Sequence, residues 1–444
     1  MCNGTIMDKL ISFSIPLMLS GILQLMFNAV DIVVVGRFSG SQALAAVGST
    51  TALINVFVNL FIGISLGANV LAARFYAAGK DREMSETVHT SITLAMVSGV
   101  IMAFVGVLFA RGALELMGTP DDVIDQCTLY MPIYFMGMPF FMLYNYGAAI
   151  LRAVGDTKRP LFYLIVAGIA NAGLNMCLVI IFHLGVAGVA IGTVISQLIS
   201  SILVLRCLYR SETSYQLRFS KLKIQKEYLK QIFQVGIPAG IQSTVINFSN
   251  VLLQSSVNSF GSIAMAGYTA ANNIFGFLYV TVNAVTQACM SFTSQNYGVG
   301  KWKRMDRVLI DCLILSFVAM MILGNSAYFF GPKLLTIYTS NSKVIQCGME
   351  ILLYTTVTYF LCGFMDLFPG ALRGMGRSGV PMILSIIGTV GTRIVWIFWI
   401  FPNHRSLDIL FISYPASWII TIVLQVICYY FVRKQLYAKM RAEA

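Results

Sequence analysis

Twelve apolar runs are the feature that most constrains the fold of this chain. A transmembrane helix needs about 20 consecutive apolar residues. A lipid-exposed backbone must satisfy its own hydrogen bonds, so such runs form helices or a closed barrel, and runs without strict alternation indicate helices. The predicted spans are residues 10–36, 48–76, 87–113, 127–151, 159–183, 185–208, 231–260, 267–297, 308–331, 346–371, 380–401 and 407–432.

The composition leaves little of the chain for other domains. Hydrophobic residues make up 57% of the 444 residues and charged residues only 11%, whereas soluble proteins are about half apolar and about a quarter charged. The nine cysteines are scattered and odd in number, which argues against a disulfide framework or a zinc site. The first apolar run is too long for a signal-peptide core, so we expect no cleavable signal.

The basic residues predict the topology. Lys and Arg number 30 and Asp and Glu 18, which gives a net charge of +12. Alternate loops carry 24 basic residues on one side and 5 on the other. By the positive-inside rule, both termini are cytoplasmic and the protein resides in the cell membrane. This topology explains the basic excess, so we expect the lipid bilayer, and not nucleic acid, as a partner.

The two halves of the chain repeat. At an offset of 221, Tyr76 matches Tyr297 and Arg152 matches Arg373, while Pro16 matches Pro238 with a slip of one residue. Six spans per half predict an all-α membrane protein of two six-helix lobes, related by a pseudo-twofold axis along the membrane normal. The expected parts are an N-lobe at 1–208, a cytoplasmic linker at 209–230 and a C-lobe at 231–444. An amphipathic portion around Tyr228, Leu229, Ile232 and Phe233 is expected to lie at the membrane surface.

Three ionisable residues lie well inside predicted spans: Asp31, Asp366 and Arg393. Such a group costs at least about 2.5 kcal/mol in the bilayer and is a functional candidate by default. The simpler alternative is a carboxylate held by hydrogen bonds between packed helices. Arg393 either pairs with Asp366 or extends its head group towards the membrane surface. Together with Gln24 and Asn247, Asp366 and Arg393 are candidates for lining a substrate cleft.

Asp31 has polar neighbours in sequence. Gln24, Asn28 and Asp31 are spaced i, i+4, i+7 and share one helix face, and Asn171 and Asn175 form an i, i+4 pair on another span. Removal from water disfavours a charged carboxylate, so Asp31 could exchange a proton near neutral pH. The same oxygens could ligate Na⁺, and the asparagines could instead join packed helices.

The sequence contains no constellation typical of an enzyme. Its three histidines are far apart, and no Walker motif, H-E-x-x-H or G-x-S-x-G is present. We therefore expect a protein that is not an enzyme, needs no cofactor or bound metal, and draws its energy from an ion gradient.

Several segments resemble motifs of the multidrug and toxic compound extrusion (MATE) family. The resemblance extends over essentially the whole chain. The segments are Pro16 to Gly36 with Gln24, Asn28 and Asp31; Ala43 to Gly48; Leu151 to Thr157; Gln295 to Gly298; and Gly370 to Gly376.

The resemblance implies a V-shaped pair of lobes that alternates between outward and inward openings. It implies antiport, in which H⁺ or Na⁺ enters while an organic, usually cationic, compound leaves. It also implies that Asp31 is the coupling acid of the N-lobe and that Asn171 is its hydrogen-bond partner. We expect a monomer that transports small molecules.

The chain also departs from the family pattern. Many bacterial members have an Asp where Asn175 stands, sodium-dependent members have acids near Asn247 and Cys362, and Arg74 replaces a usual Gln. With one acid left in the N-lobe, we favour H⁺ over Na⁺ as the coupling ion. The alternative function is a flippase for a lipid-linked or anionic amphiphile, whose cleft would carry cations; a membrane enzyme and a channel are less favoured.

Overall fold

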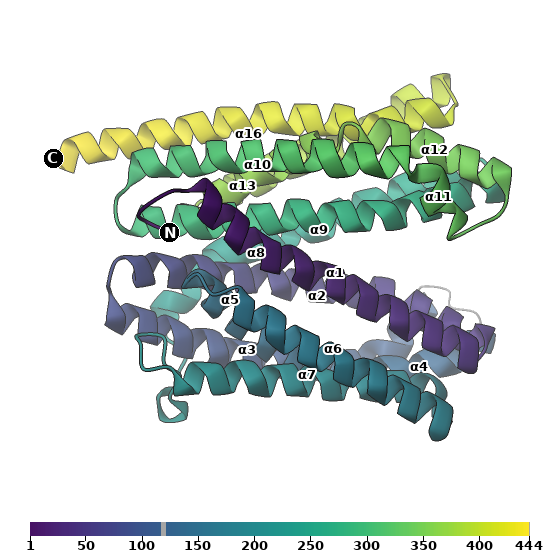
Figure 1. Ribbon diagram of the computed structural model, residues 1–444, viewed down its shortest axis with the longest axis horizontal. Coiled ribbons are helices and arrows are strands. Elements are labelled where there is room, and N and C mark those ends of the chain that lie inside the picture. The colour runs from purple at the N-terminus through teal and green to yellow at the C-terminus, as the bar shows by residue number, and fades with distance from the viewer. Residues whose placement is uncertain (117–120, 444) are drawn as a thin grey trace. The chain divides into compact units, whose positions relative to one another are not determined.

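The computed structural model describes residues 1–116 and 121–443, apart from the side chains of residues 41, 49, 52, 53, 56, 121, 122 and 439–443. This described part is helical almost throughout and contains no strand (Figure 1). Each of the twelve predicted apolar runs lies on a long helix or on a series of consecutive helical segments, as the need for internal backbone hydrogen bonding in lipid requires.

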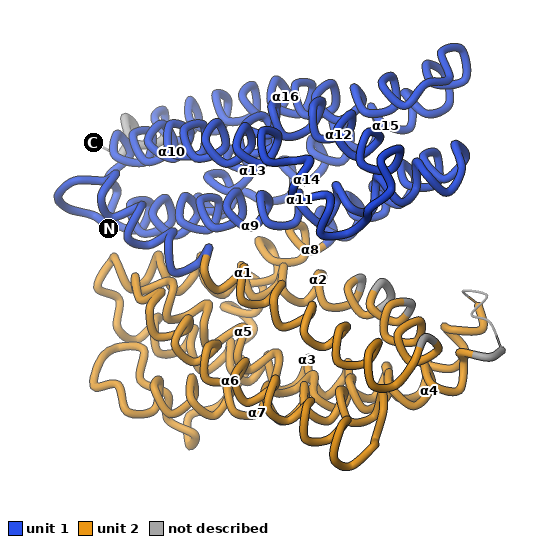
Figure 2. The backbone as a smooth tube through the Cα atoms, turned by 45° about the vertical axis from the view of Figure 1, so that its right-hand side comes forward, with its two compact units in different colours: residues 1–18, 241–444 blue, residues 19–240 orange. Residues whose placement is uncertain are grey.

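The chain forms two compact units (Figure 2). Unit 2 is residues 19–240, and unit 1 is residues 1–18 together with 241–444. Helices α1 (Met7–Phe38) and α8 (Lys226–Asn258) each contain a boundary between the units. The other helices of unit 2 are α2 (Ser41–Ala77), α3 (Asp81–Leu116), α4 (Asp121–Met136), α5 (Met138–Ala153), α6 (Lys158–Met176), the π-helical η1 (Cys177–Ile181), α7 (Gly185–Arg210) and the short η2 (Phe219–Lys221).

Unit 1 repeats this order of elements. In this unit, α9 packs against α10 and α13, and α13 also packs against α10 and α16. The helices are α9 (Ser262–Gly298), α10 (Trp302–Phe329), α11 (Gly331–Thr336), α12 (Ser342–Thr356), α13 (Tyr359–Gly374), α14 (Gly379–Ser385), the π-helical η3 (Ile386–Gly391), α15 (Thr392–Val395), the π-helical η4 (Trp396–Ile400), η5 (Phe401–Asn403) and α16 (Leu407–Glu443).

The described helices account for the predicted membrane spans. Nine are long and apolar enough to cross a membrane, and two further spans are bent pairs, α4 with α5 at 44° and α12 with α13 at 45°. Between α4 and α5, Pro139 stands in the first turn of α5, where its missing N–H is tolerated. The remaining span is α8, which is long enough but carries many Gln, Asn, Ser and Thr residues. The all-α membrane fold is therefore confirmed.

The division within α8 follows from glycine packing. A Cβ added to Gly236 would lie 2.5 Å from the Ile64 Cα, and one added to Gly63 would lie 2.3 Å from the Gly240 Cα. The first half of α8 thus packs backbone to backbone against α2 and belongs to unit 2. The sequence placed the start of the C-lobe at residue 231, whereas the compact units divide between Gly240 and Ile241.

The repeat is visible in the backbone. Gly40 and Gly261, 221 positions apart, precede α2 and α9 with φ of 90° and 96°. Such positive φ values are readily adopted only by glycine, so each half of the chain begins its second long helix from the same turn.

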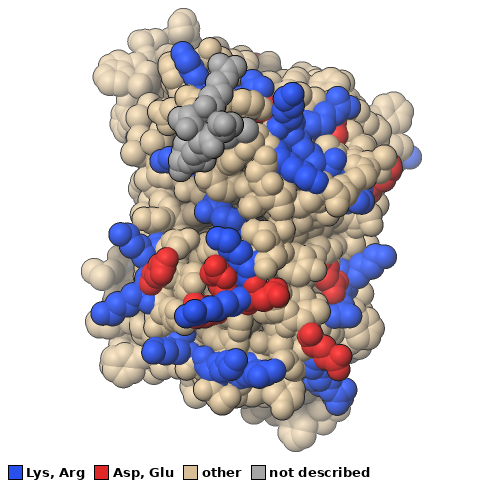
Figure 3. Space-filling model, turned by 90° about the vertical axis from the view of Figure 1, so that its left-hand side faces the viewer, with Lys and Arg blue, Asp and Glu red and all other residues tan. Residues whose placement is uncertain are grey.

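Hydrogen bonds join the linker at 209–230 to side chains of α3. His89 is buried, and its Nδ1 donates to the Ser85 carbonyl oxygen at 2.6 Å while its Nε2 accepts from the Arg218 backbone N–H at 3.0 Å. The Thr90 hydroxyl accepts from the Gln225 backbone N–H at 3.3 Å. Figure 3 views one end of the molecule, where many Lys and Arg side chains gather.

Candidate ion-coupling site

Asp31 lies on α1 and meets two other helices of unit 2. Its carboxylate accepts hydrogen bonds from the Asn175 amide of α6 and, at 3.5 Å, from the Thr193 hydroxyl of α7. No cation among the described residues forms an ion pair with it. Asp31 is therefore a half-buried acid whose described hydrogen-bond partners are neutral donors.

The partners of Asp31 form a chain of hydrogen bonds. Asn175 Nδ2 also donates to Asn171 Oδ1 at 3.2 Å, and Asn171 Nδ2 donates to the Thr193 hydroxyl at 3.4 Å. Both asparagines are buried. Asn171 was expected to bond Asp31 directly; among the described residues Asn175 makes this bond instead, and Asn171 is linked to Asp31 only through Asn175 and Thr193. The i, i+4 spacing of the asparagines on α6 places both amides on the face that meets α1 and α7.

Gly192 of α7 makes room for this arrangement. A Cβ at this position would lie 2.2 Å from the Asn175 Oδ1. That oxygen is buried and has no hydrogen-bond partner among the described residues. A buried acceptor without a hydrogen-bond partner is costly. The two hydrogen bonds donated by the Asn175 amide and the close approach of α7 hold the side chain in this position.

Of the three residues in the polar stripe predicted on the first span, one lies in the hydrogen-bonded cluster and two do not. Asp31 joins the cluster, whereas Gln24 and Asn28 are exposed and make no hydrogen bond with a described residue. Two tyrosines of α4, Tyr130 and Tyr134, lie within electrostatic range of Asp31. Thr193 was not among the residues predicted from the sequence, although a hydroxyl within an apolar span was the available signal.

Asp366 lies in unit 1, on α13. Arg373, seven positions later and on the same helix face, is the cation that acts on it. The Arg373 Nη2 in turn donates to Gln242 Oε1 of α8 at 2.7 Å. Asp366 itself makes no ion pair within 4 Å with a described residue.

Arg393 has a different environment from the one expected. The sequence offered a pair with Asp366, and this alternative is wrong for the described residues, since Arg393 Nη1 donates instead to Ser249 Oγ at 3.0 Å and Asn250 Oδ1 at 2.7 Å. The other alternative, extension towards the membrane surface, is wrong as well, because Arg393 is only 3% exposed. Asn247, on the same helix as these partners, is exposed and not hydrogen-bonded to a described residue.

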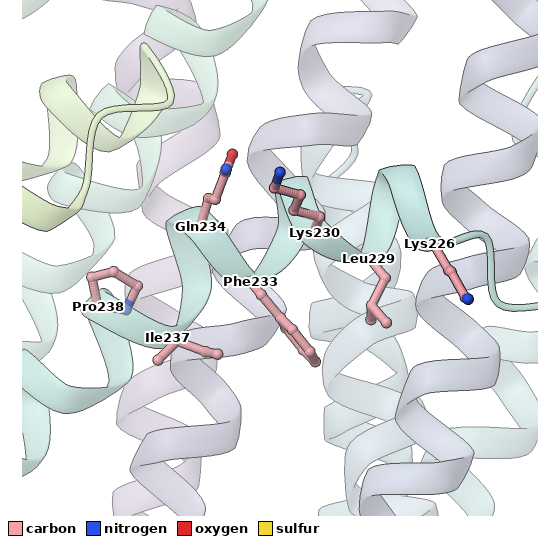
Figure 4. Close-up of a pocket in the computed structure, with 7 residues that line it drawn as sticks. All are labelled: Lys226, Leu229, Lys230, Phe233, Gln234, Ile237 and Pro238. Carbon is pink, nitrogen blue, oxygen red and sulfur yellow. The ribbon is translucent and has the colours of Figure 1, made fainter.

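A groove of about 500 Å³ follows one face of α8. Lys230 and Gln234 point to one side of the helix, and Phe233 and Ile237 point to the other (Figure 4). The membrane-surface location predicted for the amphipathic portion around Tyr228 and Ile232 stays a prediction; both side chains are buried within unit 2. The lining residues, spaced i, i+3, i+4, i+7, are Lys226, Leu229, Lys230, Phe233, Gln234, Ile237 and Pro238.

Repeated six-helix halves are typical of secondary transporters. The chain belongs to the MATE (MatE) family of multidrug efflux transporters, whose family model matches residues 16–177 and 238–399. The family resemblance stated from the motifs is thus confirmed.

Relatives of this chain cover nearly its whole length. It is 30% identical over 434 residues to the probable multidrug resistance protein YoeA of Bacillus subtilis, and the matched region covers 95% of this chain and 93% of that protein. It is 23% identical over 387 residues to the multidrug export protein MepA of Staphylococcus aureus, and the matched region covers 87% of this chain and 85% of that protein. Its fold is similar to an outward-facing MATE family transporter of the MOP superfamily, with a TM-score of 0.90, 20% identity and coverage of 99% and 97%.

Proposed function

We propose that this chain is a proton-coupled antiporter that exports lipophilic, mostly cationic organic compounds by alternating access, with Asp31 as the coupling acid. The multidrug names of its relatives support the substrate class. The observation that carries the proposal is the Asp31 cluster: an acid inside the spans of unit 2 whose described partners are the Asn175 amide and the Thr193 hydroxyl. Neither partner carries a charge that could offset the Asp31 carboxylate. Protonation of Asp31 therefore converts the cluster from a net charge of −1 to a neutral one.

The arrangement of donors favours H⁺ over Na⁺. Both described partners direct a hydrogen towards the Asp31 carboxylate, the Asn175 amide through N–H and Thr193 through O–H. Na⁺ is a hard cation that needs several oxygen ligands directed at it, whereas a carboxylate surrounded by donors exchanges a proton without rearranging them. A sodium site would require the Asn175 amide to turn and present its oxygen.

The remaining features of the proposal follow from the charge distribution. The excess of basic residues in alternate loops favours a protein of the cell membrane with both termini in the cytoplasm. We take residues 1–208 and 231–444 as the moving lobes, with the linker at 209–230 between them, in a monomer that needs no cofactor and performs no enzymatic reaction.

The experiment uses the purified protein in liposomes. Ethidium is supplied outside the liposomes together with either an imposed pH gradient, acidic inside so that protons leave as ethidium enters, or an imposed Na⁺ gradient of equal size, with the higher Na⁺ concentration inside. The proposal predicts ethidium uptake driven by the pH gradient and none above background with the Na⁺ gradient. Uptake driven by Na⁺ alone would contradict the choice of ion, and no uptake with either gradient would contradict cation export.

A flippase for an anionic amphiphile is the second candidate. The observation that favours it is Arg393, a buried cation with no described carboxylate partner. Against it stand Asp31 and Asp366 in the spans, since a cleft for an anion would avoid acids. In the same liposomes, movement of a fluorescent anionic lipid between leaflets in the absence of ethidium transport would favour the flippase.

A further inference from the structure

Arg393 is a guanidinium buried in the middle of a span. It lies in the single α-helical turn α15, between the π-helical turns η3 and η4, in the span Gly379–Asn403. π-Helical turns inside helices are rare and often mark functional positions. A buried cation in a membrane is expensive, and proteins keep one where it pairs or binds.

No described carboxylate forms an ion pair with Arg393 within 4 Å. The titratable groups that act on it are three tyrosines and a cysteine from α9, α13 and α16. Its hydrogen bonds go to Ser249 and Asn250 of α8, both through Nη1. Its charge is therefore solvated by neutral groups but is not neutralised. The four titratable groups are Tyr268, Tyr359, Cys362 and Tyr414.

The guanidinium is held in a fixed orientation. Its Cζ lies 4.7 Å from the centre of the Tyr414 ring, so the ring covers one face of the guanidinium plane. The Tyr414 hydroxyl is hydrogen-bonded to the Tyr268 hydroxyl at 2.9 Å, which fixes the ring. Nη1 makes both hydrogen bonds to α8, whereas Nε is a buried donor that has no partner among the described residues.

The repeat relates this cluster to the Asp31 cluster. Tyr414 is the counterpart of Thr193 at the offset of 221. The offset of 222 that relates Pro238 to Pro16 relates Arg393 to Asn171 and Asn250 to Asn28, which precedes Asp31 on α1 but lies outside its hydrogen-bond network. Equivalent helices of the two halves, α1, α6 and α7 against α8, α15 and α16, thus build clusters of opposite charge.

We propose that Arg393, held by Asn250 and Tyr414, is a binding site for a carboxylate group of an amphiphilic substrate. A carboxylate matches the planar fork of a guanidinium and accepts two parallel N–H bonds along the edge that includes Nε. It would satisfy the free donor and neutralise the charge. The proposal deepens the proposed transport function, on which it rests, by extending the substrates from cations to compounds that also carry a carboxylate.

The test compares two dyes that differ only in this group. Tetramethylrhodamine carries a free carboxylate and its methyl ester does not. Binding to the full-length protein in detergent is measured by fluorescence anisotropy. We expect the acid to bind at least about tenfold more tightly than the ester, and Arg393→Gln to remove this preference while the affinity for the ester changes less than about twofold. Arg405→Gln is the matched control, because Arg405 is an exposed loop arginine stacked on Phe260 at 5.8 Å.

A second measurement uses the unmutated protein and so does not depend on folding of the variant. Excess benzoate should displace the acid dye and leave the ester bound, whereas chloride at the same concentration should displace neither. Equal affinity for the two dyes, displacement of both by benzoate, or displacement of the acid by chloride would overturn the proposal. These binding results are independent of ion gradients, so failure of proton coupling in liposomes is read separately.

Discussion

Asp31 on α1 and Asn175 on α6 are joined by a hydrogen bond between residues 144 positions apart in the chain. The bond links the first helix of the chain to the sixth and fixes one oxygen of the carboxylate. Because Asn175 also bonds Asn171 at 3.2 Å, Asp31 is attached to a small network and not to a single partner. Disturbing the network should alter coupling even when Asp31 is intact.

Asn175→Ala removes the donor to Asp31 while leaving the acid in place. A hydrogen bond to a charged group contributes about 1.5–3 kcal/mol, so we expect the proton-driven transport rate to fall roughly tenfold to a hundredfold. Asn145→Ala is the control, since Asn145 donates only to the Phe141 carbonyl oxygen of its own helix at 2.8 Å. Initial rates of ethidium uptake in liposomes measure both. Equal rates for the two variants would show that the Asn175 bond has no role in coupling.

Gly192→Ala tests the close approach of α7 to Asn175. The new methyl group would occupy the space 2.2 Å from the Asn175 Oδ1 and displace the amide from Asp31. Overpacking of this kind costs about 1–3 kcal/mol, so transport should fall and the melting temperature should decrease by a few degrees. Gly173→Ala on α6 is the matched control, because a Cβ there meets nothing within 4 Å. A Gly192→Ala protein with unchanged transport would contradict this role of Gly192.

Pro16 and Pro238 each lie two residues before a boundary between the compact units. Proline inside a helix removes one backbone hydrogen bond and weakens the helix by about 3 kcal/mol or more. Replacement by alanine should stiffen α1 and α8 at these points. We expect the double substitution to slow transport at least about fivefold while dye binding in detergent stays the same. Loss of binding together with transport would indicate a packing defect instead.

His89→Ala should release the linker from α3. The variant loses the acceptor for the Arg218 backbone N–H, which costs about 1–3 kcal/mol for a buried group. Limited trypsin digestion should then cleave the linker at its basic residues about tenfold faster. The exposed loop residue His404, changed to alanine, serves as the control. Cleavage at the unmutated rate would mean that other contacts hold the linker.

The fold could be predicted from the sequence because apolar length and backbone hydrogen bonding determine it. The site could be predicted only in part. The i, i+4 spacing of Asn171 and Asn175 identifies one helix face, and Asp31 is conspicuous as an acid in an apolar run. Thr193 is a partner of Asp31 because of how helices distant in the sequence pack. The same holds for Ser249 and Asn250 as partners of Arg393. The spacing of Gln24 and Asn28 placed them beside Asp31, but helix periodicity does not say which residues a neighbouring helix covers.

Proton movement driven by substrate tests the role of Asp31 most directly. Liposomes containing the protein and a pH-sensitive dye receive ethidium outside, with no ion gradient imposed. Antiport predicts that ethidium entry drives protons out and raises the internal pH for the unmutated protein. Asp31→Asn should abolish this rise, and Asp311→Asn, a buried acid paired with Arg307 at 3.0 Å, should retain it. A rise of normal size with Asp31→Asn would contradict the assignment of Asp31 as the coupling acid.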